Sequence, residues 1–127
     1  MTHPIVLLQA ALVAALRADL EPPVFDAPPK QSVPPYVAIV RHDVLPRDGD
    51  AAQGHEHRLV LHAWSAEASR KSVLATAEDI VEIALALASA DLAITLRRHD
   101  RTDTSIDPAT GRARAAIALT YFTEASS

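Results

Sequence analysis

The chain has 127 residues, a net charge of −4 and no cysteine. This length fits a single domain over residues 1–127, and the lack of cysteine excludes disulfides, thiol catalysis and cysteine-based zinc sites. No basic run is long enough to grip nucleic acid through its phosphates. Aromatic residues make up only 4%, so the core must be built from Leu, Ile, Val and Ala. A core with so few large side chains favours an oligomer, in which association buries further apolar surface.

The first predicted element is a helix over about residues 4–20. Leucine and isoleucine recur at steps of three and four residues from Ile5 to Leu16, which places them on one stripe. Thr2 is the expected N-cap, and Pro4 suits the first turn. The apolar stretch is too short to span a bilayer, so we expect a soluble protein made in the cytoplasm.

Proline dominates residues 21–35, which predicts an extended connector within the domain, with a short strand around Val24–Asp26. Two long strands are predicted next, at Tyr36–Val44 and His55–Trp64. The polar stretch Leu45–Gly54 reads as a turn of about ten residues between them.

Strict alternation puts Val37, Ile39 and Arg41 on one face of the first of these strands and His42 on the other. The rule that alternate residues share a face is the only basis for this assignment.

A second amphipathic helix is predicted over about residues 69–89, followed by strands at Ala93–Arg101 and Arg112–Thr123. The loop Thr102–Gly111 joins these strands, and Asp-Pro-Ala-Thr-Gly at its end is a strong turn signal. The order αββαββ predicts an α+β fold in which two helices pack on one face of a four-stranded, mostly antiparallel sheet.

Arginine recurs along the last two predicted strands (Arg97, Arg98, Arg101, Arg112 and Arg114). Alternation sets Arg97 and Arg101 opposite Arg98, and puts Arg112 and Arg114 on one face. Pairing within the chain, to Asp100 and Asp103, is the favoured interpretation. Pairing between the subunits of a ring is the alternative.

The histidines suggest two further sites. His55 and His57 share a strand face and reach one metal ion if Asp50 supplies a third ligand, but the favoured interpretation is solvent-exposed histidine. His62 beside Trp64 suggests a pocket, but packing on a half-buried sheet face is favoured. We therefore predict no catalytic residue, no cofactor site and no metal site.

In their order, these landmarks resemble the family of small phage-type tail completion proteins, once a domain of unknown function. The family includes tail terminators of long-tailed phages and of phage-like gene transfer agents. The matching segments span nearly the whole chain: Leu7–Leu20, Val24–Pro28, Pro35–Ile39, Arg58–Ser65, the helix after it, and Ala118–Glu124.

The resemblance implies a structural protein and not an enzyme: a homohexameric ring that caps the tail tube and joins it to the head-side stopper or connector. Made in the bacterial cytoplasm, it would enter a phage or phage-like particle at the head–tail junction, with DNA crossing its lumen unread and without membrane or cofactor. Candidate subunit contacts are Arg97, Arg101, Arg112, Arg114 and Trp64, and candidate partner contacts are Arg47, Asp48, Asp50, Asp107 and Thr110.

Two alternatives remain at this point. One is a head–tail stopper or adaptor, which shares the size and the context. The other is a small cytosolic dimeric enzyme or ligand-binding domain with a pocket near His62 and Trp64.

Overall fold

The computed structural model describes residues 3–31, 33–48 and 53–125 of the chain. The elements in chain order are α1 (Pro4–Asp19), β1 (Val24–Phe25), β2 (Tyr36–Asp48), β3 (Gln53–Trp64), α2 (Arg70–Leu85), β4 (Leu92–Ile106) and β5 (Ala113–Ala125).

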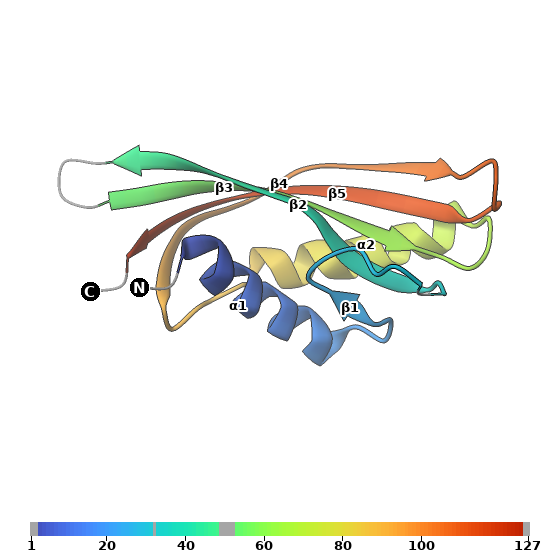
Figure 1. Ribbon diagram of the computed structural model, residues 1–127, viewed down its shortest axis with the longest axis horizontal. Coiled ribbons are helices and arrows are strands. Elements are labelled where there is room, and N and C mark those ends of the chain that lie inside the picture. Colours follow the sequence, from blue (N-terminus) through green and yellow to red (C-terminus); the bar gives the residue numbers. More distant parts are fainter. Residues whose placement is uncertain (1–2, 32, 49–52, 126–127) are drawn as a thin grey trace.

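The protein is a two-layer α+β structure, with both helices on one face of a single mixed sheet (Figure 1). The strand order is β1-β2-β3-β5-β4, in which only the β1–β2 pair is parallel. The predicted helix layer is confirmed, whereas the predicted four strands are five. The fifth strand is the short segment expected near residue 24, which adds to the sheet edge through Val24 and Phe25.

Both helices are shorter than predicted. His3, not Thr2, caps α1: its ring Nδ1 accepts a hydrogen bond from the Ile5 amide, while Thr2 lies outside the described residues. The α2 helix is capped by Ser69 and ends at Leu85, four residues before the predicted end. The helix was predicted to continue because the apolar pattern extends to Leu87. The side chain of Leu87 is buried in the core, although its backbone lies after the end of the helix.

Strand alternation is interrupted by β-bulges, and this corrects two predictions. Between Ile39 and Arg41 the β2 register shifts by one residue, so Arg41 lies on the face opposite Val37 and His42 takes the helix-covered side. A second shift, between His99 and Arg101, places Arg98 and Arg101 on the same open face of the sheet. A bulge adds one residue to one strand only, which reverses every later side chain.

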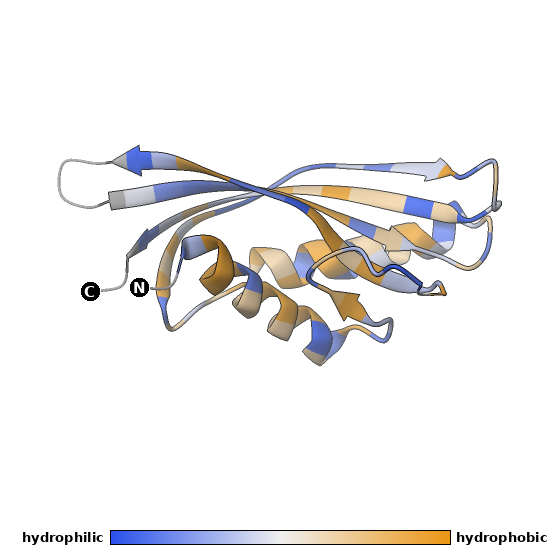
Figure 2. Ribbon diagram, in the orientation of Figure 1, coloured by the Kyte–Doolittle hydropathy of each residue, from blue (hydrophilic) through white to orange (hydrophobic). Residues whose placement is uncertain are grey.

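Both hairpins are longer than predicted, and their turns are correspondingly shorter. Strand β2 continues to Asp48 and β3 starts at Gln53, so most of the predicted loop 45–54 is strand. Likewise β4 extends to Ile106, leaving the predicted turn at Asp107–Gly111. The first of these segments is polar because it extends beyond the helix layer, and Figure 2 shows the hydrophilic end of β2. In the second segment, Ile106 still packs against the core. Pro46 is compatible with a strand because β2 is an edge there.

The core lies between the helices and the covered face of the sheet (Figure 2). Leucines of α1 and small apolar residues of α2 pack against alternate residues of β3 and β5. The central members are fully or almost fully buried: Leu8, Leu12, Leu16, Ile80, Ala84, Leu59, Leu61, Ile117 and Leu119. At one end of this core, the hydroxyl of Tyr121 donates a 2.8 Å hydrogen bond to the carbonyl of Ala84, which ties β5 to the last turn of α2.

Candidate assembly surfaces

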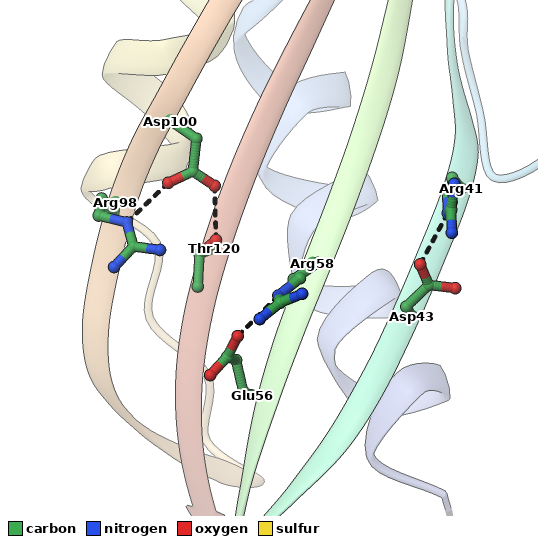
Figure 3. A network of polar contacts seen from close by, with 7 residues as sticks. All are labelled: Arg41, Asp43, Glu56, Arg58, Arg98, Asp100 and Thr120. Atoms are coloured by element: carbon green, nitrogen blue, oxygen red, sulfur yellow. Dashed lines mark hydrogen bonds and ion pairs between the residues drawn. The ribbon is translucent and has the colours of Figure 1, made fainter.

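Four arginines on the open face of the sheet are each paired with a carboxylate two residues away, and Figure 3 shows three of these pairs. Alternate residues of a strand share a face, which is why this spacing produces pairs. The nitrogen–oxygen distances are 2.7 Å for Arg41–Asp43, 2.7 Å for Arg58–Glu56, 2.6 Å for Arg98–Asp100 and 3.5 Å for Arg101–Asp103. These pairs are largely solvent-exposed, so they mask charge more than they stabilise the fold.

Asp100 has two partners on this face. It accepts hydrogen bonds from Arg98 at 2.6 Å and from the hydroxyl of Thr120 at 2.5 Å (Figure 3). Desolvation tends to raise the pKa of Asp100, but the hydrogen bonds from Thr120 and Arg98 outweigh it, and the pKa lies below its usual value. The carboxylate therefore stays ionised and keeps the Arg98 charge matched.

The arginines singled out from the sequence have different surroundings. The predicted pairing within the chain is confirmed for Arg98 with Asp100 and for Arg101 with Asp103. Arg97 points to the helix side, where Nε donates to the carbonyl of Leu87 at 2.6 Å and fastens the segment after α2. Arg112 lies just before β5 and is partly buried.

Arg114 belongs to a row of large side chains across one end of the open face. In this row Tyr36 of β2 lies opposite Trp64 of β3, and Trp64 lies opposite Arg114 of β5. Phe25 extends the row, with its ring 6.0 Å from that of Tyr36 in an edge-on arrangement. Within the described residues, the Nε of Arg114 is buried without a hydrogen-bond partner. Trp, Tyr and Arg are the residue types enriched where protein partners bind most strongly.

His62 lies beside this row, and the expected half-buried face is confirmed for both His62 and Trp64. Desolvation, followed by the charge of Arg114, lowers the pKa of His62. Four open grooves of about 380–430 Å³ occur on the described surface, and neither His62 nor Trp64 lines any of these four.

Two other histidines, His42 and His57, form a hydrogen-bonded cluster that the sequence did not reveal. His57 is fully buried, which contradicts the expectation that it is exposed. Its Nδ1 lies 2.8 Å from Nε2 of His42, and its Nε2 lies 2.9 Å from the hydroxyl of Thr123. Nε2 of Gln9 completes the chain, 3.2 Å from Nδ1 of His42. The bulge in β2 turns His42 inward, so no alternation rule could have found this contact.

Burial lowers the pKa of both His42 and His57 from 6.5 to about 4. For His57 the neighbouring rings of His42, His55 and His3 lower it further, whereas Asp43 partly opposes the shift at His42. Both rings are therefore neutral at neutral pH. Among the described residues, no three potential metal ligands are grouped so that they could hold an ion.

The candidate partner-contact residues lie at two opposite ends of the molecule. Arg47 and Asp48 end β2, and Asp50 lies outside the described residues. Asp107 and Thr110 form the β4–β5 turn, where the Asp107 carboxylate accepts from the Ala109 amide and the Thr110 hydroxyl. Gly111 closes this turn with a φ of 70°, a left-handed conformation that favours glycine. The first hairpin reaches the end of β5 and the second lies at its start, so their tips point in opposite directions (Figure 1).

Comparison with known proteins identifies a family and a solved structure of the same fold. Residues 7–124 match the family described as "Tail completion protein gp17". A chain in a solved structure described as "Virion of native gene transfer agent (GTA) particle" has the same fold, with a TM-score of 0.81 and 20% sequence identity. That match covers 97% of this chain and 99% of the other. No curated protein matches the sequence. No helix in the described ranges is both long and apolar enough to cross a bilayer.

Proposed function

Because the chain belongs to the tail completion protein gp17 family, which consists of structural phage-type tail proteins and not of enzymes, we propose that it is a tail terminator. In this proposal six copies form a ring that caps the tail tube at the head–tail junction and joins it to the head-side stopper or connector. The observation that carries the proposal is the family match over nearly the whole chain, residues 7–124.

The opposed hairpins support a protein that binds two different partners. A terminator has to contact the tube on one side and the head-side connector on the other. The β2–β3 tip with Arg47 and Asp48 lies at one end of β5, and the β4–β5 turn with Asp107 and Thr110 lies at the other. The first hairpin extends past the helix layer (Figure 1), and residues 108–111 of the β4–β5 turn are exposed, so each end is available to a separate partner.

The charges of the broad faces support passage of DNA without capture. On the open face, the arginine of each of the four pairs has a carboxylate within 3.5 Å. Few unpaired cations are therefore left to bind DNA phosphates in place of their counterions. On the helix side, α2 exposes Glu78, Asp79 and Glu82. Neither face presents an uncompensated basic track.

Among the candidate subunit contacts, Trp64 and Arg114 have the strongest support. They lie in the row of large side chains that Tyr36 and Phe25 continue to the β1–β2 edge of the sheet. We propose that Arg101 and Arg112, which line the same side of the molecule, contribute secondary contacts. Arg97 acts within the subunit, since it is bonded to the carbonyls of Leu87 and Ile94.

Native mass spectrometry and size-exclusion chromatography test this function, on the protein alone and mixed with the tube protein of the same particle. We expect a closed homohexamer, formed either by the protein alone or on addition of the tube protein. A strictly monomeric species at high concentration in both samples contradicts the proposal.

A further inference from the structure

We infer that neighbouring copies of this chain join head to tail through two different flanks, the α2–β4 flank of one copy and the α1–β1 flank of the next. The inference rests on the proposed ring and specifies which surfaces close it. Three observations support it. Each helix has an apolar stripe with no partner in the subunit, the sheet and the helix layer end at the same two flanks, and the charge of Arg17 beside the α1 stripe is opposite in sign to the charges beside the α2 stripe.

The first stripe lies on α2, on the side facing β4. Leu74 and Leu85 are each 41% exposed, and Val81 lies between them at helical spacing. Beside them is an open groove of about 400 Å³ between α2 and β4, lined by Leu74, Ala77 and Val81 together with Thr102 of β4. Apolar side chains at this spacing normally lie against another element.

The second stripe lies on the outer side of α1. Val6 is 55% exposed, and the exposed Ala10 and Ala14 follow it at helical spacing, with the buried Val13 between them. They line a groove of about 430 Å³ that also reaches Arg17 and Asp26. Alanine side chains are small and leave room for a neighbouring helix to approach closely. The α1 stripe is therefore complementary in shape to the α2 stripe, whose leucines project from the helix.

The two stripes lie on opposite flanks of one subunit. The sheet ends in β1 and β2 on one side and in β4 on the other. Helix α1 contacts α2, β1 and, less extensively, β4, whereas the main contacts of α2 are with β4 and β5, and Figure 1 shows the two helices side by side under the sheet. Both layers therefore end together at each flank. A neighbour placed beside the α2–β4 flank continues the helix layer with its α1 and the sheet with its β1–β2 edge.

The free strand edges have compatible directions. Strand β4 pairs only with β5, and β2 is covered by β1 only at Val37 and Ala38, so each has an open edge. Both β2 and β5 are antiparallel to β3, and β4 is antiparallel to β5, which makes β4 antiparallel to β2. Edges of this kind are normally covered, and a closed ring covers all of them without leaving ends.

One charge beside the α1 stripe, that of Arg17, is complementary to the charges beside the α2 stripe. The Arg17 guanidinium donates to the carbonyl of Val24 at 2.8 Å, and no described carboxylate lies within ion-pair distance of it. The α2 groove is bordered by Glu78 and Glu82. Because α1 and α2 run in opposite directions (Figure 1), a neighbour placed this way brings Arg17 toward the Leu74–Glu78 end of the stripe. Apolar contact with a matched charge at its border is typical of a specific interface.

Two single variants test the contact because each removes one flank. Ala10→Glu places a negative charge on the α1 flank, where it meets Glu78 and Glu82 of the neighbour, and Leu74→Lys places a positive charge on the α2–β4 flank, where it meets Arg17. Both positions are exposed, so the subunit should fold. We expect each variant to raise the concentration needed for half-assembly at least tenfold. Mixed in equal amounts, the two variants should form dimers and no larger species. The intact flank of one variant binds the intact flank of the other, and both flanks that remain free are the altered ones, so the pair cannot grow further.

Val33→Glu is the matched control, because Val33 is 77% exposed but lies in the proline-rich connector. We expect it to assemble like the wild type, with circular dichroism and melting temperature confirming the fold of all three variants. Folded single variants that assemble like the wild type, or a mixture without dimers, overturn the flank contact while leaving the ring in place. A wild type that never assembles overturns the ring and this contact together.

Discussion

His57 takes part in a chain of hydrogen bonds whose directions are fixed by chemistry. The Gln9 amide nitrogen is a donor, so Nδ1 of His42 accepts and Nε2 of His42 carries the proton. That proton points to Nδ1 of His57, whose Nε2 proton then points to Thr123. Every link is satisfied only when both rings are neutral. The four residues lie on α1, β2, β3 and β5, so this chain of hydrogen bonds connects the helix layer to the base of the β2–β3 hairpin.

We therefore expect acid to destabilise the fold through these rings. Both pKa values fall from 6.5 to about 4 on folding, so between these values the unfolded chain binds more protons. The free energy of unfolding should be fully retained above about pH 6.5 and should decrease toward pH 4, with His57 contributing at most on the order of 3 kcal/mol. The nearby titratable groups His3, Asp43 and His55 modulate this range.

The measurement is the melting temperature from pH 7.5 to 4.5, for the wild type and for His42→Gln/His57→Gln. Carboxylates titrate in both proteins, so the informative quantity is the difference between the two curves. The double variant should be less stable at pH 7.5 and lose less on acidification. His99→Asn, at an exposed histidine, should follow the wild type. Parallel curves for wild type and double variant would show that the chain does not sense acid.

At the scale of elements, periodicity predicted both helices and the four long strands in their order along the chain. It did so because the apolar residues of each element recur at the spacing that faces the core. It could not predict the bulges in β2 and β4, since a bulge is specified by the register of the partner strand and not by local composition. One extra residue in β2 moved Arg41 to the open face and turned His42 inward. One extra residue in β4, before Arg101, placed Arg101 on the open face as well. The ion-paired face and the histidine chain both depend on these shifts.

The close approach of backbones at Gly54 gives a prediction for the first hairpin. A Cβ at this position would lie 2.7 Å from the carbonyl oxygen of Arg47 and 3.2 Å from that of Thr123, and neither backbone atom can swing away. Gly54→Ala should therefore lower the free energy of unfolding by about 2 kcal/mol. Chemical denaturation measures this change.

Gly111 supplies the comparison. Its φ of 70° favours glycine, but nothing lies within 4 Å of an added Cβ. Asparagine tolerates this conformation, so Gly111→Asn should cost well under 1 kcal/mol. A loss at Gly54→Ala no larger than that at Gly111→Asn would argue against the close approach.

At the scale of the whole molecule, the family was identifiable from the order of short segments, each of which is weak alone. The surfaces were less predictable, because pairing and burial depend on which strands are neighbours. Pairing of arginines with Asp100 and Asp103 was expected, and Arg98 and Arg101 of β4 do pair with them, whereas Arg97 is bonded to backbone carbonyls. The stripes on α1 and α2 were visible as apolar spacing, but only the fold shows that they lie on opposite flanks.

The paired charges of the open face give a prediction about DNA. Asp43→Asn/Glu56→Gln/Asp100→Asn frees three arginines and raises the net charge from −4 to −1. This variant should bind duplex DNA at least tenfold more tightly than the wild type at low salt, with an affinity that falls steeply as salt increases. Fluorescence anisotropy with a labelled duplex measures both quantities.

The control is Asp19→Asn/Glu21→Asn/Glu67→Gln, which changes the net charge equally at exposed carboxylates that pair with no arginine in the described part of the chain. We expect little gain in DNA binding from it. Equal gains in both variants would mean that net charge alone matters and that the pairing on the open face does not mask the arginines.

The opposed hairpins have a mechanical consequence. Strand β5 starts at one turn and ends beside the other hairpin, a length of about 40 Å for its 13 residues. The screening length in physiological salt is about 8 Å, so a charge bound at one tip is not felt at the other. Any coupling between the two ends must instead pass through contacts within the subunit, and β5 is the strand that runs from one end to the other.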